Sequence, residues 1–144
     1  MKLLILNGPN LNMLGIREKH LYGARTYEDL QLYILKKARE LDIDVDVYQS
    51  NHEGDLVDKI QSAYGKMDGI IINPAAYTHT SVAILDALKA VNLPAAEVHL
   101  TDITQREPFR RISYAGMACQ AHFIGLGFAG YARAMEYLCQ TLRK

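Results

Sequence analysis

Long hydrophobic runs, a surplus of charge of one sign and paired cysteines are all missing from this 144-residue sequence. No apolar run approaches the roughly 18 residues of a transmembrane helix, and the first residues do not have the pattern expected of a signal peptide. Sixteen basic and sixteen acidic residues cancel, which argues against a nucleic acid or a membrane surface bound by bulk charge. We therefore expect a cytoplasmic protein with neither kind of partner.

Cysteine occurs only as Cys119 and Cys139, without CxxC or metal-ligand spacing, so both are expected to be free thiols in a reducing compartment. The five histidines form no HxxxH or HxxE cluster, and the sequence predicts no metal site. An apolar fraction of 49% and a charged fraction of 22% are ordinary for a globular protein. At this length we expect a single domain over residues 1–144 that needs no disulfide or structural metal.

What the sequence does contain is an alternation of apolar, β-rich runs with stretches of helical period. Strands are predicted at residues 2–6, 43–50, 69–73, 94–100 and 122–127, and helices at 26–41, 53–64, 80–91 and 131–142. Strands alternating with helices imply an α/β fold with a parallel sheet covered on both faces. The count suits a flavodoxin-like, three-layer α/β/α fold with five parallel strands in the order 2-1-3-4-5.

Helix boundaries are predicted from capping residues. Thr26 with Asp29 resembles a capping pair at the start of the first helix. Gly65 is expected to stop the second helix, and Thr78 or Thr80 to cap the third.

Polar side chains gather where the predicted strands end. In such sheets ligands bind outside the carboxyl ends of the strands. The residues in those places are Asn7, Asn10, Asn12, Arg17 and Tyr22 after the first strand, Asn73, Tyr77, Thr78, His79 and Thr80 after the third, and Glu97, His99, Leu100, Thr101, Arg106 and Arg110 around the fourth. Amides, hydroxyls, imidazoles and guanidinium groups together suit a small polyhydroxylated anion and offer groups for proton transfer.

Each of these residues could instead have a purely structural role. Glu97 and His99 point to the same face of a strand, which fits either an acid–base histidine with its supporting carboxylate or a structural pair. His79 could cap or pack, and asparagines after a strand are common turn formers. A catalytic tyrosine at Tyr22 would need a nearby cation to ionise at neutral pH, and Arg17 lies in the same loop.

A glycine-rich motif near the end of the sequence suggests a rival function. Gly125, Gly127 and Gly130 satisfy the GxGxxG fingerprint, but a single helix follows and no second strand carries the acidic residue that a dinucleotide site needs. Close packing of helix on strand is the preferred explanation. A flavin- or nucleotide-binding module and a non-catalytic assembly protein are the two alternatives to an enzyme.

Several separated motifs resemble one family. The blocks "NGPNLNMLGIRE", "SNHEGDL", "INPAAYTHTSVAILDAL", "EVHLT" and "GLGFAGY" make the chain similar, nearly end to end, to the type II 3-dehydroquinate dehydratases. This resemblance implies reversible anti elimination of water from 3-dehydroquinate to 3-dehydroshikimate through an enolate, in the shikimate or quinate pathway. It also implies no metal, no cofactor and a homododecamer built as a tetramer of trimers.

The resemblance assigns catalytic roles. Tyr22 matches the base that removes a proton from carbon 2, and Arg17 matches the lid arginine that polarises it. His99 matches the general acid, Glu97 orients it, and Asn10 helps to hold the enolate through a water. With Asn12 in the pocket floor, residues 13–23 are expected to form a lid over the substrate.

The resemblance also assigns substrate contacts. They are Asn73, His79, Arg110, the backbone at Leu100 and Thr101, and Arg106 as a supporting arginine. Asp86 matches an acid that reaches the active site of a neighbouring subunit.

Four positions depart from the pattern of the family. Lys19 stands where proline is common, and Ala75 replaces a frequent glycine without an expected effect. Asp102 adds a charge near an anionic substrate, and Pro108 replaces a frequent acidic residue.

Overall fold

A parallel sheet with the strand order β2-β1-β3-β4-β5 lies at the centre of the computed structural model, which describes residues 1–16, 20 and 24–144. Its strands are β1 (Lys2–Asn7), β2 (Asp44–Gln49), β3 (Gly69–Asn73), β4 (Ala95–His99) and β5 (Ala121–Ile124). All neighbouring strands pair in parallel. The predicted strand order is confirmed, and β2, whose sequence alternates, lies at an edge.

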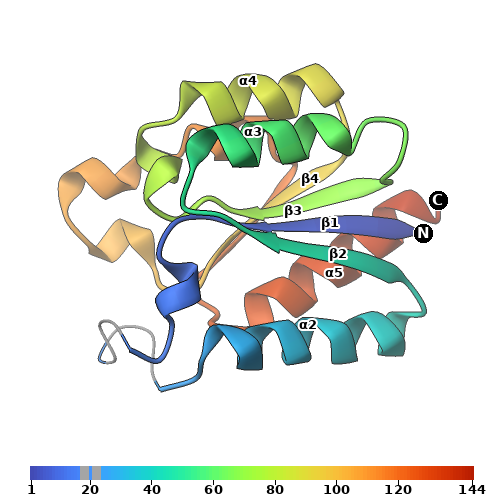
Figure 1. Cartoon of the computed structure of the whole chain (residues 1–144), viewed down its shortest axis with the longest axis horizontal. Helices are drawn as coiled ribbons and strands as arrows, with labels where there is room; N and C mark the ends of the chain where they lie inside the picture. The colour runs from blue at the N-terminus through green and yellow to red at the C-terminus, as the bar shows by residue number, and fades with distance from the viewer. Residues whose placement is uncertain (17–19, 21–23) are drawn as a thin grey trace.

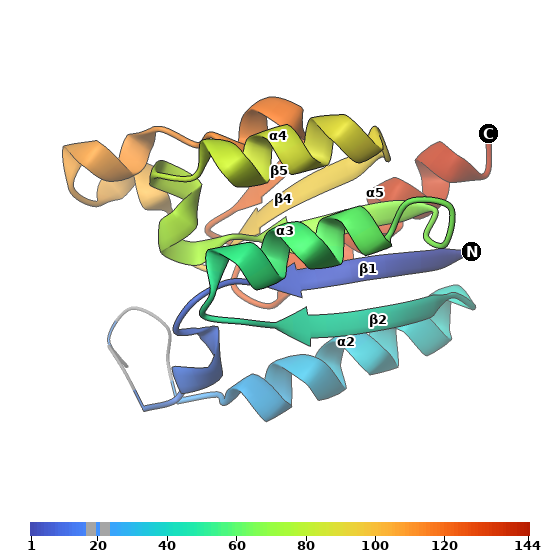
Figure 2. The ribbon, with the colours of Figure 1, turned by 45° about the horizontal axis from the view of Figure 1, so that its top comes forward.

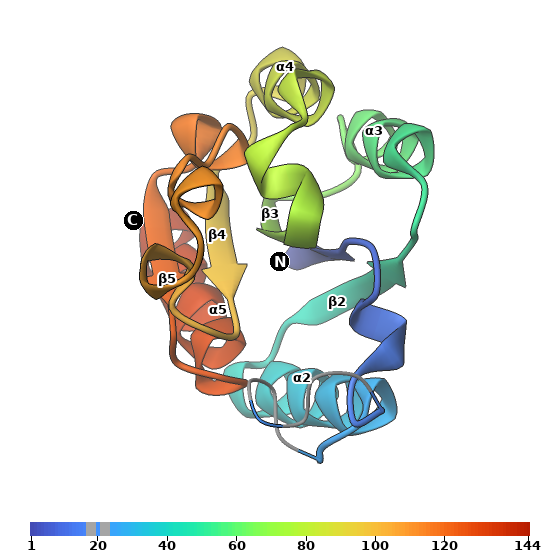
Figure 3. The same ribbon diagram turned by 90° about the vertical axis from the view of Figure 1, so that its left-hand side faces the viewer.

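In the ranges that the structure describes, four α-helices cover the two faces of the sheet and produce the three predicted layers (Figure 1). The helices α2 (Tyr27–Leu41) and α5 (Ala129–Leu142) lie on one face, and α3 (Glu53–Ser62) and α4 (Val82–Val91) lie on the other. Figure 3 shows the same arrangement from the side, with α3 and α4 above the sheet and α2 below it.

Alternation along the strands divides the core into two halves. In β1, Leu3 and Ile5 pack with the residues of α2 and α5, whereas Leu4 and Leu6 pack with those of α3 and α4. In β4, Val98 belongs to the first cluster, so its neighbours Glu97 and His99 point to the opposite face. Both polar side chains are therefore buried on the α3–α4 side, at 1% and 4% exposure.

The predicted start of α2 is correct, whereas the predicted end of α3 at Tyr64, before Gly65, is two residues too late. The capping box at Thr26 is confirmed, since its hydroxyl accepts from the Asp29 amide at 3.1 Å and the Asp29 carboxylate accepts from the Thr26 amide at 2.8 Å. Helix α3 ends at Ser62, before the turn that holds Gly65 at a φ of 72°.

The predicted cap of the next helix, Thr78 or Thr80, was wrong. The cap is Ser81, whose Oγ accepts from the Ile84 amide at 2.9 Å. The chain leaving β3 first forms a 3₁₀ helix, η2 (Ala75–His79), which occupies the residues around Thr78 and delays the start of α4.

Short 3₁₀ helices collect at the carboxyl ends of the strands, and none of them was predicted. Four of them lie there, η1 (Leu11–Met13), η2, η3 (Ile103–Gln105) and η4 (Pro108–Arg111), whereas η5 (Ala115–Ala118) precedes β5 and packs against α4. In Figure 2, η1 is the blue turn beside the arrowhead of β2. One-turn helices have no hydrophobic period that a sequence could reveal. Over the described ranges, no helix has the length and apolar character required to cross a membrane.

Candidate active site

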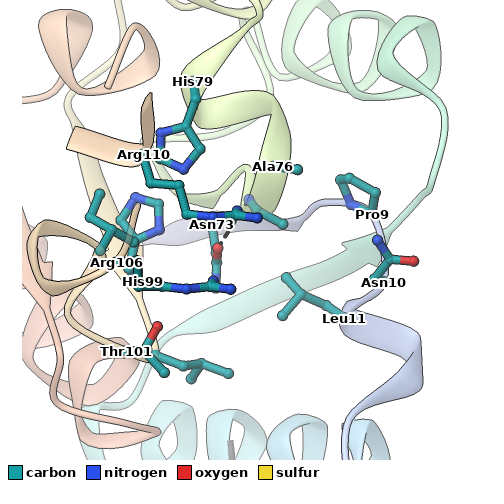
Figure 4. Close-up of a pocket in the computed structure, with 13 residues that line it drawn as sticks. Pro9, Asn10, Leu11, Asn73, Ala76, His79, His99, Thr101, Arg106 and Arg110 are labelled. Carbon is teal, nitrogen blue, oxygen red and sulfur yellow. Dashed lines mark hydrogen bonds between the residues drawn. The ribbon is translucent and has the colours of Figure 1, made fainter. Parts of the chain in front are cut away.

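A pocket opens at the carboxyl ends of β1, β3 and β4, where the fold predicts a ligand site. Its lining consists of Pro9, Asn10, Leu11, Asn73, Ala75, Ala76, His79, His99, Leu100, Thr101, Ile103, Arg106 and Arg110. Figure 4 shows these side chains on several sides of the pocket, and they come from strand ends, 3₁₀ helices and loops.

The structure brings together most of the residues that the sequence singled out. Asn10, Asn73, His79, His99, Leu100, Thr101, Arg106 and Arg110 all line the pocket. Glu97 lies behind His99, and Asp86 is exposed on α4, away from the lining of its own pocket. Arg17 and Tyr22 lie outside the described residues, as do Lys19 and most of the predicted lid at 13–23.

The amide of Asn73 is held by buried partners. Its Nδ2 donates to the hydroxyl of Tyr131 at 3.1 Å, and its Oδ1 accepts from the backbone amide of Ala75 at 3.2 Å. The Tyr131 hydroxyl donates in turn to Oδ1 of Asn7 at 2.6 Å. Since an amide nitrogen carries two hydrogens, Asn73 keeps one N–H to offer to a ligand.

His79 presents a defined nitrogen to the pocket. Its Nδ1 lies 2.7 Å from the carbonyl oxygen of Ile112, which can only accept, so Nδ1 carries the proton. Burial lowers the pKa of His79, and the bond to Ile112 offsets this only in part. In the neutral ring, Nε2 remains as an acceptor for a substrate hydroxyl.

Glu97 and His99 form the predicted pair, with Nε2 of His99 2.7 Å from Oε1 of Glu97. Burial by itself raises the pKa of Glu97, but hydrogen bonds from His99, Ser113 and His122 outweigh it and lower that pKa to about 2. The ionised carboxylate can only accept, which assigns the proton to Nε2 of His99. The other ring nitrogen, Nδ1, is then the atom available to the pocket.

Three residues around Glu97 escaped the sequence analysis. Ser113 donates to Oε1 of Glu97, and Nδ1 of His122 lies 2.8 Å from Oε2. Gly116 packs so closely that a Cβ there would overlap Oε2 of Glu97 and lie 2.8 Å from Oγ of Ser113. Only the pairing of β4 with β5, which places Glu97 opposite His122, could have indicated the second histidine.

Arg106 and Arg110 bring positive charge to the pocket. Figure 4 shows both side chains extending toward its centre. Nε of Arg110 lies 2.7 Å from Oε2 of Glu107, and Nε of Arg106 lies 3.9 Å from the same oxygen. Backbone and Arg110 hydrogen bonds lower the pKa of Glu107, so this carboxylate is ionised and steadies the guanidinium group of Arg110 from outside.

The loop after β1 contributes one of its two predicted asparagines. Asn10 adopts a left-handed backbone with a φ of 68°, and its backbone N–H donates to Oδ1 of Asn51 at 3.0 Å. Asn12 does not line the pocket, contrary to the prediction, because its side chain is turned toward Nε2 of Gln49 at 3.4 Å.

Two of the departures from the family pattern have a clear local role. Asp102 accepts from the amide of Thr104 at 3.0 Å and caps η3, which keeps its charge out of the pocket lining. Pro108 takes the first position of η4, where its lack of an N–H costs nothing. Ala75 is not neutral as expected: its φ of 52° costs alanine about 1–2 kcal/mol more than glycine.

The GxGxxG motif is explained only in part by packing. A Cβ on Gly130 would lie 3.2 Å from Cγ1 of Val98, which supports close contact of α5 with β4. Gly125 and Gly127 instead have φ values of 78° and 58° and form the turn from β5 into α5.

Within the described part of the chain, this site contains neither a metal-binding cluster nor a disulfide. Among the residues that the structure describes, no three His, Cys, Asp or Glu side chains are grouped to hold an ion. Cys119 and Cys139 are both free thiols, as predicted. Burial, with the charge of Glu97, raises the pKa of Cys119 to about 12, so this thiol stays neutral near the Glu97–His99 pair.

Comparisons with known proteins single out one family. The family model described as dehydroquinase class II matches residues 1–139. A 3-dehydroquinate dehydratase of Clostridium acetobutylicum is 49% identical over 144 residues, covering 100% of both chains. The catabolic 3-dehydroquinase 2 of Aspergillus terreus is 49% identical over 97% of this chain and 95% of that protein. The crystal structure of a type II dehydroquinase from Butyrivibrio crossotus superposes with a TM-score of 0.94 at 49% identity, over 96% and 97% of the two chains.

Proposed function

This chain belongs to the class II dehydroquinases, and on that premise we propose that it is a 3-dehydroquinate dehydratase, a hydro-lyase of the shikimate or quinate pathway. It removes water from 3-dehydroquinate to give 3-dehydroshikimate, and the reaction is reversible. The observation that carries the proposal is the pocket itself, in which two arginines, an amide and two histidines converge at the carboxyl ends of the strands.

The arginines and Asn73 account for recognition of the substrate. Arg106 and Arg110 provide guanidinium groups suited to a carboxylate, and Asn73 and His79 offer a donor and an acceptor to hydroxyl groups. Leu100 and Thr101 add contacts from the chain after β4. A carbocyclic, polyhydroxylated acid uses all of these partners at once.

His99 is proposed as the general acid. With Nε2 directed to Glu97, the ring faces the pocket through Nδ1, and the carboxylate stabilises the imidazolium before it releases its proton. That proton passes to the departing hydroxyl, which leaves as water. Glu97 acts through His99 and does not line the pocket.

The proposed base is Tyr22, with Arg17 stabilising its ionised form; both roles follow from the resemblance in sequence. The base takes the proton from carbon 2, and the charge of the resulting enolate is held by Asn10 through a water. Residues 13–23 are proposed to close over the substrate and exclude solvent.

The working form is proposed to be a homododecamer, a tetramer of trimers, in the cytoplasm. Asp86 supports this assignment, because it is exposed on α4 and lies outside the pocket of its own chain. In the trimer it would reach the pocket of a neighbouring copy. Light scattering tests the assembly directly: a mass far below twelve chains contradicts it.

The reaction is tested by mixing the purified protein with 3-dehydroquinate and following the absorbance of the conjugated enone. EDTA and borohydride serve as controls for metal-dependent and Schiff-base mechanisms, and neither is expected to stop turnover. A flat trace, or loss of activity with either reagent, contradicts the proposal. The variant Tyr22→Phe is expected to bind a substrate-like carboxylate while turning over almost no substrate.

A further inference from the structure

The Glu97 carboxylate is fixed from two sides by two different histidines. Its Oε1 faces Nε2 of His99 at 2.7 Å, and its Oε2 faces Nδ1 of His122 at 2.8 Å. The second contact arises from the sheet, because the parallel register of β4 and β5 sets Glu97 opposite His122. Neither the reaction scheme nor the pocket lining accounts for His122.

We propose that His122 is a positioning residue for the acid: its Nδ1–H holds Oε2 of Glu97 so that Oε1 stays directed at His99. The kinetic part of this inference rests on the proposed function. His122 does not line the pocket, so it acts on the substrate only through Glu97 and His99.

The geometry explains why a second donor is needed. The torsion that orients a glutamate carboxylate is broad and roughly twofold, so hydrogen bonds to one oxygen alone do not fix its plane. Ser113 and His99 both bind Oε1, which leaves Oε2 beside Gly116 with His122 as its donor. A buried carboxylate oxygen without a donor is costly, and rotation to find one would turn Oε1 away from His99.

The exposure of the two histidine partners of Glu97 supports different roles for them. The His99 side chain is 5% exposed and faces the pocket, whereas the His122 side chain is 44% exposed, at the outer edge of the sheet. An imidazole at that position contributes little to the core. Its hydrogen bond to Glu97 is therefore the contribution of this side chain to the structure.

A matched pair of variants separates the hydrogen bond from the side chain. In His122→Asn, the amide nitrogen occupies the place of Nδ1 and can still donate to Glu97; in His122→Leu, a methyl group occupies it. We expect His122→Leu to lower kcat about tenfold with KM changed less than about twofold, as for partial loss of a general acid. His122→Asn should restore kcat to within about twofold of the parent. If the leucine variant folds poorly, His122→Val offers the same deletion in a residue that strands favour.

A second readout does not depend on turnover. Exchange of the Nε2 proton of His99 with solvent, followed by NMR in the unliganded protein, should be slow in the parent and in His122→Asn but fast in His122→Leu. Unchanged kcat and slow exchange in the leucine variant overturn the inference, and so does an asparagine variant as slow in turnover as the leucine one. If the parent protein does not act on 3-dehydroquinate, the proposed function fails while the exchange measurement still decides the role of His122.

Discussion

Asn73 and Tyr131, 58 residues apart, are joined by a buried hydrogen bond of 3.1 Å between the amide Nδ2 and the phenol oxygen. The same hydroxyl donates to Asn7 at 2.6 Å, so one tyrosine of α5 ties together the carboxyl ends of β1 and β3. Burial raises the pKa of Tyr131, which keeps the hydroxyl protonated and able to donate. The Asn73 amide in the pocket is thereby oriented by α5, which packs on the α2–α5 face of the sheet.

Removing that hydroxyl should cost stability and binding together. The variant Tyr131→Phe removes the partner of two buried amide atoms, Nδ2 of Asn73 and Oδ1 of Asn7, and we expect the free energy of unfolding to fall by about 2 kcal/mol. Urea unfolding measures the loss, and a higher KM should accompany it as Asn73 loses its orientation.

Tyr64 provides the control for Tyr131, because it is 71% exposed. Tyr64→Phe should unfold at the same urea concentration as the parent. Matching unfolding curves for the two phenylalanine variants would show that the buried network contributes nothing.

Glu97→Gln should mainly affect the chemical step. Glutamine keeps the size of the side chain but cannot stabilise an imidazolium at His99, so kcat should fall about 100-fold while KM changes little. Glu28→Gln, on the first turn of α2, is the control and should leave kcat unchanged. A Glu97→Gln protein with normal kcat would remove the carboxylate from the mechanism.

The stability of the fold should depend on pH through the same residue. Hydrogen bonds hold the pKa of Glu97 at about 2 against burial, below its ordinary value of 4.5. A lowered pKa stabilises the folded state fully above about pH 4.5, and this stabilisation is lost as the pH falls toward 2. Urea unfolding of the parent and Glu97→Gln should therefore differ most near pH 6, and the difference should shrink by pH 3. A difference that stays constant over this range contradicts the assignment.

Gly116 should tolerate no side chain. A Cβ there would overlap the Glu97 carboxylate and crowd Ser113, so Gly116→Ala should lower both kcat and the unfolding free energy, the latter by about 1–3 kcal/mol. The control is Gly54→Ala in α3, where a Cβ meets nothing within 4 Å. Alanine there should leave kcat unchanged and raise stability by about 0.5–1 kcal/mol. Equal effects of the two substitutions would contradict the close approach at Glu97.

Arg110→Lys should weaken substrate binding although the charge is kept. Lysine cannot present two parallel N–H groups to a carboxylate or keep the 2.7 Å contact of Nε with Glu107, so KM should rise about tenfold. The neighbouring Arg111 is exposed and lies outside the pocket lining, so Arg111→Lys is the matched control with an unchanged KM. Steady-state kinetics at fixed ionic strength distinguish the two; a normal KM for Arg110→Lys excludes a paired contact.

Local patterns predicted those features that depend on neighbours in the chain. Apolar runs and helical spacing located the strands and the four helices that the structure describes, and Thr26 with Asp29 correctly marked the start of α2. The alternation of Glu97 and His99 was sufficient to place both on one face, where they form a hydrogen bond. The roles of Tyr22 and Arg17 stay predictions, because these residues lie outside the described ranges.

The sequence by itself determined the layers of the fold, the edge at which the site lies and most of the polar side chains that line it, because periodicity and strand ends are local properties. Tertiary structure alone decided that His122 and Ser113 hold Glu97 and that Tyr131 orients Asn73. Those partners come from segments distant in the chain, and their contacts depend on the register between strands and on helix packing, which are set by the shape of the whole core.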